Sequence, residues 1–94
     1  MKKREDGAHY VYIVQCADGT LYTGWTTDLE ARMDAHNSGA GAKYTRGRGP
    51  VRLIYSETLE TMSEALKREN QIKKLDRAAK LKLAISYNQG GISL

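Results

Sequence analysis

The sequence lacks several features that would place a chain in a particular class. It contains a single cysteine, Cys16, which excludes an internal disulfide framework and fits a reducing cytoplasm. It has no apolar run near the roughly 20 residues that span a bilayer. The basic start MKKRED is not followed by the apolar core of a secretory signal. We therefore expect a cytoplasmic protein without a membrane segment.

Length and composition point to one small globular domain. The chain has 94 residues, of which 40% are hydrophobic and 28% charged, and this composition is typical of a folded protein rather than a disordered one. No internal repeat or long linker divides it. We expect a single domain over residues 9–86, a disordered N-terminus over 1–8 and a frayed C-terminal tail over 87–94. The net charge of +4 is a mild bias towards polyanions.

The first elements form a predicted β-hairpin. Residues 9–16 (HYVYIVQC) and 21–25 (LYTGW) have the composition of strands, and Asp18-Gly19 between them is a turn signal. A two-residue turn would place Tyr12 and Tyr22 on opposite faces. A three-residue loop with a left-handed Gly19 would pair position 16 with position 20 and place the two tyrosines on one face.

Three helices and a third strand are predicted from capping signals and periodicity. The capping box over residues 27–30 starts a helix at about residue 28, which ends near residues 37–39. Residues 51–57 alternate as a strand. A second capping box over 61–64 starts another helix, and Asp76 can cap a third. The order β-β-α-β-α-α predicts an α+β fold with a small, mostly antiparallel three-stranded sheet flanked by helices.

Some side chains are unusual for their predicted positions. Glu69 lies on the helix stripe of Met62, Ala65 and Ile72 that should face the core, where a carboxylate is costly unless it is paired or bound to a cation. It could pair with Lys73 at the rim, or be a metal ligand in a cleft. In the first helix, three side chains share a face and Arg32 lies beside them: Leu29, Met33 and His36.

For the remaining candidates, an ordinary structural role competes with a functional one. Arg32 could drape over apolar neighbours or hold a phosphate with its planar fork. A strand tyrosine is usually packing material, and His36 on an apolar face is more often a core residue than a ligand.

The glycine-rich segment GAGAKYTRGRG, residues 39–49, is a predicted loop with a phosphate-binding composition. Glycines let the backbone approach a phosphate chain closely, while Lys43, Arg46 and Arg48 supply charge. Tyr44 could stack or donate a hydrogen bond. The alternative is a solvated connection. A basic loop of this length in so small a domain favours a function.

Taken in order, these motifs resemble the GIY-YIG nuclease superfamily, in particular its stand-alone single-domain bacterial branch. Tyr10-Val11-Tyr12 is similar to the first motif and Tyr22-Thr23-Gly24 to the second. Arg32 follows the second tyrosine by ten residues, as the catalytic arginine does. Glu69, in SEALKRENQIKKL, matches the glutamate that holds the metal. The resemblance covers about residues 9–84, and it favours the three-residue loop, since both motif tyrosines share one cleft in this family.

The resemblance implies hydrolysis of DNA phosphodiesters with one divalent cation, Mg²⁺ or Mn²⁺, bound by Glu69. Tyr12 would take a proton from the attacking water, Tyr22 would orient water or phosphate, and Arg32 would stabilise the transition state. Gly24, His36 and Tyr44 are second-tier candidates. The predicted nucleic-acid contacts are Lys43, Arg46, Arg48 and Lys73. The implied partners are DNA and possibly a protein that supplies specificity, with no small-molecule cofactor.

The sequence departs from the family pattern at three positions. Tyr10 stands where the family has its leading glycine, and Trp25 replaces a residue that is often polar or basic. Many members have an asparagine about twelve residues after the metal glutamate, and this chain has Leu81 there. These departures leave two further hypotheses beside the endonuclease: a nucleic-acid-binding module with little or no catalysis, and a basic scaffold whose tyrosines belong to the core.

Overall fold

The computed structural model describes residues 8–38 and 49–92 of the chain. Within these residues the elements follow the predicted order β-β-α-β-α-α. Their bounds are β1 His9–Gln15, β2 Leu21–Thr26, α1 Leu29–Ser38, β3 Arg52–Leu59, α2 Met62–Lys73 and α3 Arg77–Ile92. The three strands form one sheet in the order β2-β1-β3, and both pairings are antiparallel. The predicted α+β class is therefore confirmed.

The hairpin between β1 and β2 has the register of the three-residue loop. The Cys16 amide donates to the Thr20 carbonyl at 2.8 Å, and Gly19 has a φ of 87°, a left-handed conformation that glycine adopts at little cost. Val14 consequently pairs with Tyr22, and Tyr12 pairs with Gly24. Because paired residues of antiparallel strands point to the same face, Tyr12 and Tyr22 lie on one side of the sheet.

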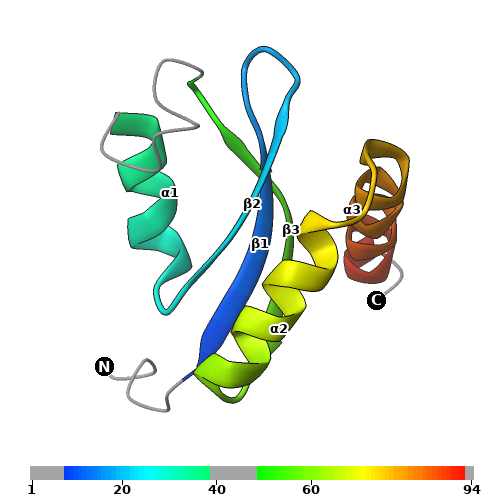
Figure 1. Cartoon of the computed structure of the whole chain (residues 1–94). Coiled ribbons are helices and arrows are strands. Elements are labelled where there is room, and N and C mark those ends of the chain that lie inside the picture. Colours follow the sequence, from blue (N-terminus) through cyan, green and yellow to red (C-terminus); the bar gives the residue numbers. More distant parts are fainter. Residues whose placement is uncertain (1–7, 39–48, 93–94) are drawn as a thin grey trace.

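The two faces of the sheet are covered by different helices (Figure 1). On one face, α1 packs Leu29 and Met33 against Tyr12 and Val14. On the other, α2 and α3 enclose a second hydrophobic cluster of Val11, Ile13, Ile54, Ala65, Ile72 and Ala84. The alternation along β1 therefore buries this strand on both sides, which is expected for the central strand of a three-stranded sheet.

Helix capping follows the prediction at α2 and α3 and differs by one residue at α1. The Glu64 amide donates to Thr61 Oγ1 at 3.1 Å, and the Ala79 amide donates to Asp76 Oδ1 at 2.9 Å. At α1, the capping oxygen belongs to Asp28, which accepts from the Ala31 amide at 3.1 Å. Both Thr27 and Asp28 are good capping residues, and the helix begins after the second of them.

The predicted apolar stripe of α2 is only partly buried. Ala65 and Ile72 have no exposed surface, whereas Met62 is 49% exposed and Leu66 40%. The narrow sheet explains the difference, since a flat surface of three strands covers only a narrow stripe of a helix. In α3 the helix continues to Ile92, through most of the segment predicted to be a frayed tail. No proline interrupts it, and each added residue contributes one further helical hydrogen bond.

Two predicted segments cannot be compared with the structure. Residues 1–7, predicted to be disordered, and the basic loop over 39–48 lie outside the described residues. The ends that border the loop are joined, because the Val51 amide donates to Asn37 Oδ1 at 2.6 Å. Within the described ranges, no helix combines the length and apolar character needed to cross a bilayer.

Candidate functional site

The absence of a side chain at Gly24 lets Tyr12 reach the edge of the sheet. Tyr12 lies on the central strand, and its ring passes over its partner Gly24 on the edge strand β2. A Cβ atom at position 24 would lie 2.6 Å from the Tyr12 hydroxyl oxygen and 2.9 Å from Cζ. Both separations are shorter than van der Waals contact. Glycine is therefore required here for a close approach of the Tyr12 ring to the backbone of β2.

The Tyr12 hydroxyl is hydrogen-bonded to two side chains of α1. Its oxygen lies 3.0 Å from His36 Nε2, and Arg32 Nε donates to it at 3.3 Å. Because a guanidinium can only donate, the phenol oxygen accepts from Arg32, and its proton can be donated to His36 Nε2 in the tautomer that carries its hydrogen on Nδ1. One turn of helix separates Arg32 from His36, and this spacing places both side chains on the face that looks onto the sheet.

Burial favours the uncharged forms of the histidine and the tyrosine in this network, whereas the arginine stays charged. His36 is 1% exposed and Tyr12 is fully buried. Burial lowers the pKa of His36, and the nearby Arg32 charge lowers it further, so the imidazole is neutral at pH 7. Burial also raises the pKa of Tyr12, although the hydrogen bond from Arg32 opposes that effect. The phenol is consequently protonated at neutral pH.

Tyr22 joins the same cluster from the edge strand. Its ring packs edge-on against His36 with 5.6 Å between the ring centroids, and it lies 6.5 Å from the ring of Tyr12. Tyr22 also interacts electrostatically with Arg32. Unlike Tyr12, Tyr22 is only half-buried. Of the two motif tyrosines, it is the one with a surface open to a ligand.

Glu69 approaches this cluster from α2. Only 13% of its side chain is exposed, and its charge acts on the Tyr12 phenol strongly enough to contribute to the raised pKa. Lys73 Nζ lies 3.4 Å from Glu69 Oε2, one helical turn away. The sequence left open whether Glu69 pairs with Lys73 at the rim or binds a metal in a cleft. The ion pair is present, and the role of Glu69 as a metal ligand stays a prediction.

The carboxylate of Glu69 suits one hard cation better than an enclosed metal centre. Within the described residues, no group of three or more histidine, cysteine or acidic side chains could hold a metal ion. Mg²⁺ commonly binds through one or two carboxylates and keeps several water molecules, with substrate phosphate completing the site. A single, largely buried carboxylate fits that pattern.

Other candidates from the sequence lie elsewhere. Lys43, Tyr44, Arg46 and Arg48 fall outside the described residues. Leu81, at the position of the family asparagine, packs against the hydrophobic cluster under α2 and α3. Trp25 packs on the same cluster, and its ring lies 5.8 Å from that of His9. From its place on an apolar stripe, the sequence could not tell whether His36 has a functional role or only packs in the core. Its hydrogen bond to Tyr12 is stronger evidence for a functional role.

Comparisons with known proteins agree with this arrangement. A UPF0213 protein of Clostridium perfringens is 60% identical over 78 residues, which are 83% of this chain and 84% of the relative. The solution NMR structure of a UPF0213 protein from Bacillus halodurans is 50% identical, with a TM-score of 0.52 and 81% of each chain covered. That of a protein from E. faecalis is 45% identical, with a TM-score of 0.59, and covers 87% of this chain and 88% of its own.

The family assignment rests on the same region that forms the cluster of tyrosines. Residues 8–82, from the start of β1 into α3, match the GIY-YIG catalytic domain. This match includes both motif tyrosines, Arg32 and Glu69, and the relatives that share the fold are small bacterial proteins of similar length. The chain therefore belongs to the GIY-YIG family, within the UPF0213 group of single-domain proteins.

Proposed function

We propose that this protein is a metal-dependent endonuclease that hydrolyses DNA phosphodiester bonds. The observation that supports this most directly is the convergence of Tyr12, Tyr22, Arg32 and His36 at the edge of the sheet, within electrostatic reach of Glu69. A phosphodiester is an anion, and hydrolysis needs a positive group for the transition state and an oriented water molecule. An arginine and a half-buried phenol side by side offer these two functions.

In this proposal, the two tyrosines have different tasks. A group that takes a proton from water must come within about 3 Å of it, and the buried Tyr12 has no surface at which water can be contacted. Tyr22, which is half-buried, orients the attacking water. Tyr12 does not contact the water. It positions two side chains of α1 by accepting a hydrogen bond from Arg32 and donating one to His36. This assignment differs from the one implied by the family resemblance, in which Tyr12 contacts the water.

Arg32 stabilises the charge that develops on the phosphorus oxygens. Its hydrogen bond to Tyr12 raises the pKa of the guanidinium, so this side chain remains a permanent cation. Its Nε–H is used by Tyr12, and the terminal N–H groups form the fork that can contact two phosphate oxygens. Glu69 would hold Mg²⁺ or Mn²⁺, which supplies Lewis-acid activation of the phosphate and its water. Specificity would come from the shape of the DNA or from a protein partner.

Cleavage of supercoiled, branched and single-stranded DNA in Mg²⁺ or Mn²⁺ tests the proposal. We expect Glu69→Gln to abolish cleavage, with Glu60→Gln as a control because Glu60 is an exposed acid outside the cluster. Tyr22→Phe should lower the rate by at least about 10²-fold and Tyr12→Phe by about tenfold, because only the former contacts water. Cleavage that persists in Glu69→Gln at the rate of the unmodified protein would refute the endonuclease.

A second candidate function is a nucleic-acid-binding module without catalysis. Leu81 favours it, because this side chain packs in the core where many relatives of the wider family have an asparagine. DNA binding without cleavage in any metal would establish this alternative. We do not expect Leu81→Asn to restore activity, because a buried amide without a hydrogen-bond partner destabilises the fold by about 1–3 kcal/mol.

A further inference from the structure

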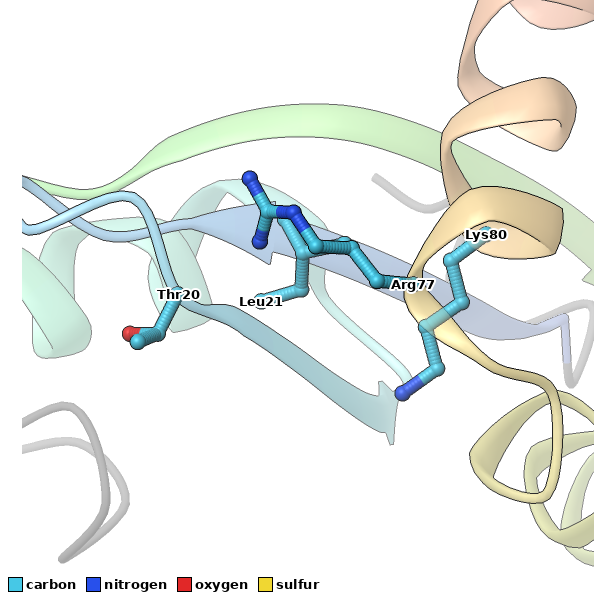
Figure 2. Close-up of a pocket in the computed structure, with 4 residues that line it drawn as sticks. All are labelled: Thr20, Leu21, Arg77 and Lys80. Atoms are coloured by element: carbon cyan, nitrogen blue, oxygen red, sulfur yellow. The ribbon is translucent and has the colours of Figure 1, made fainter.

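A small pocket lies between the start of α3 and the start of β2, outside the candidate active site. Its volume is about 240 Å³, and it is lined by Thr20, Leu21, Arg77 and Lys80. Figure 2 shows both cationic side chains starting from α3, with Arg77 extending over Leu21 and Lys80 extending in another direction alongside the strand. Because none of the four lining residues is acidic, the pocket has a net positive charge. The volume suits a small anion or one group of a larger ligand.

The hydrogen bonds around the pocket hold one of its cations in place. Arg77 Nη1 donates to the Gly19 carbonyl at 2.7 Å, which fixes the guanidinium against the hairpin loop. The neighbouring acids are engaged locally: Asp18 accepts from both the amide and the hydroxyl of Thr20, and Asp76 caps α3. A guanidinium that donates to one carbonyl keeps further N–H groups for a phosphate, and Lys80 adds a second positive charge to the lining of the pocket.

The pocket is placed along the strand that carries Tyr22 and Gly24. An extended strand rises about 3.3 Å per residue, so Leu21 and Gly24 are about 10 Å apart. Leu21 packs on the cluster under α2 and α3, whereas Tyr22 packs on the α1 side, so the pocket and the tyrosines lie on opposite sides of this edge strand. A DNA strand that passes over the edge of the sheet can contact both sides. Lys73 and Lys74, both exposed, precede α3 in the chain.

We propose that this pocket binds a backbone phosphate of the DNA substrate, outside the site at which the bond is cut. The inference deepens the proposed function and rests on it. A contact of this kind fixes the position of the DNA strand without reading its sequence. It also gives the single-domain protein a second point of attachment that lies within the described residues and is separate from the basic loop.

Measurement of DNA affinity at several salt concentrations tests the inference. We expect Lys80→Gln to weaken binding of a short duplex three- to tenfold and to lower the salt slope by about 0.9, the value for one lost phosphate contact. Arg77→Gln should have a similar effect. Lys82→Gln is the matched control, because this exposed lysine of α3 does not line the pocket. In cleavage assays, Lys80→Gln should raise KM with little change in kcat.

The outcomes separate this inference from the proposed function. If the unmodified protein binds and cuts DNA but Lys80→Gln and Arg77→Gln match the Lys82→Gln control, the pocket is not a DNA contact and the endonuclease stands. If the unmodified protein neither binds nor cuts DNA, both proposals fail. Titration with inorganic phosphate, followed by NMR shifts of Thr20 and Leu21, distinguishes a site for free phosphate from a site for the DNA backbone. Shifts with phosphate in a protein that does not bind DNA would overturn the assignment to a DNA backbone. Circular dichroism confirms that each variant is folded.

Discussion

Replacing Gly24 by alanine tests the close packing of Tyr12 over the edge strand. The new methyl group would lie 2.6 Å from the Tyr12 hydroxyl oxygen and 3.1 Å from Tyr22 Cε2. Tyr12 is fully buried and cannot move aside without disturbing His36 and Arg32. Overpacking of this kind typically destabilises a fold by about 1–3 kcal/mol.

A second effect of the substitution would stabilise the fold, so the sign of the change in Tm shows which effect is larger. Alanine restricts the unfolded chain more than glycine does and, where the backbone conformation permits it, stabilises a protein by about 0.4–1 kcal/mol. Gly24 does not have a positive φ, so backbone propensity alone predicts stabilisation. If the steric contact dominates, the net loss is about 1–2 kcal/mol, which lowers the Tm by roughly 4–16 °C for a domain of this size.

Thermal unfolding followed by circular dichroism measures this difference. Gly49→Ala is the matched control, because a Cβ atom there meets no atom of the described residues within 4 Å, and its Tm should be unchanged or slightly raised. In the background of Gly24→Ala, the change Tyr12→Phe should recover part of the loss, since it removes the closest atom but leaves Cζ at 2.9 Å. A Tm for Gly24→Ala equal to or above that of the unmodified protein would contradict the described packing.

Three further predictions concern the charges. The pKa of His36 is lower in the folded state than the unfolded value of about 6.5, so stability is present above that pH and is lost as the pH falls below it. The urea midpoint of the unmodified protein should therefore drop between pH 7 and 5 more than that of His36→Gln; parallel curves would refute this. Arg32→Gln should raise the pKa of Tyr12 in an ultraviolet titration calibrated with Tyr12→Phe, and an unchanged pKa would exclude the hydrogen bond. Arg68→Gln breaks the 2.8 Å pair with Glu57, which is about 30% exposed, and should cost less than about 1 kcal/mol in urea unfolding, with Lys67→Gln unchanged.

The sequence predicted the hairpin from its turn signal, while the family resemblance chose between the two possible registers. Only a glycine adopts the left-handed conformation of residue 19 at little cost, and a one-residue change would have turned Tyr22 away from Tyr12. The α1 stripe was predicted equally well, since Leu29 and Met33 pack on the sheet as their spacing indicates.

Features that depend on tertiary packing were not predictable in the same way. The exposure of Met62 and Leu66 follows from the width of the sheet, which periodicity does not contain. The different burial of Tyr12 and Tyr22 follows from their places on a central and an edge strand. The pocket beside Arg77 and Lys80 was not predicted, because its two halves come from segments almost 60 residues apart that meet in the fold, where Arg77 donates to Gly19.

The hydrogen bond from the Val51 amide to Asn37 has a consequence for how this protein can change. It fastens the end of α1 to the start of β3 with a 2.6 Å contact that does not involve residues 39–48. The entropy of closing a chain grows slowly with its length, so an insertion between two fastened ends adds little to the cost of folding. The length and charge of the stretch between them can therefore change, in evolution or by design, while the β-sheet and its cluster of phenols remain as they are.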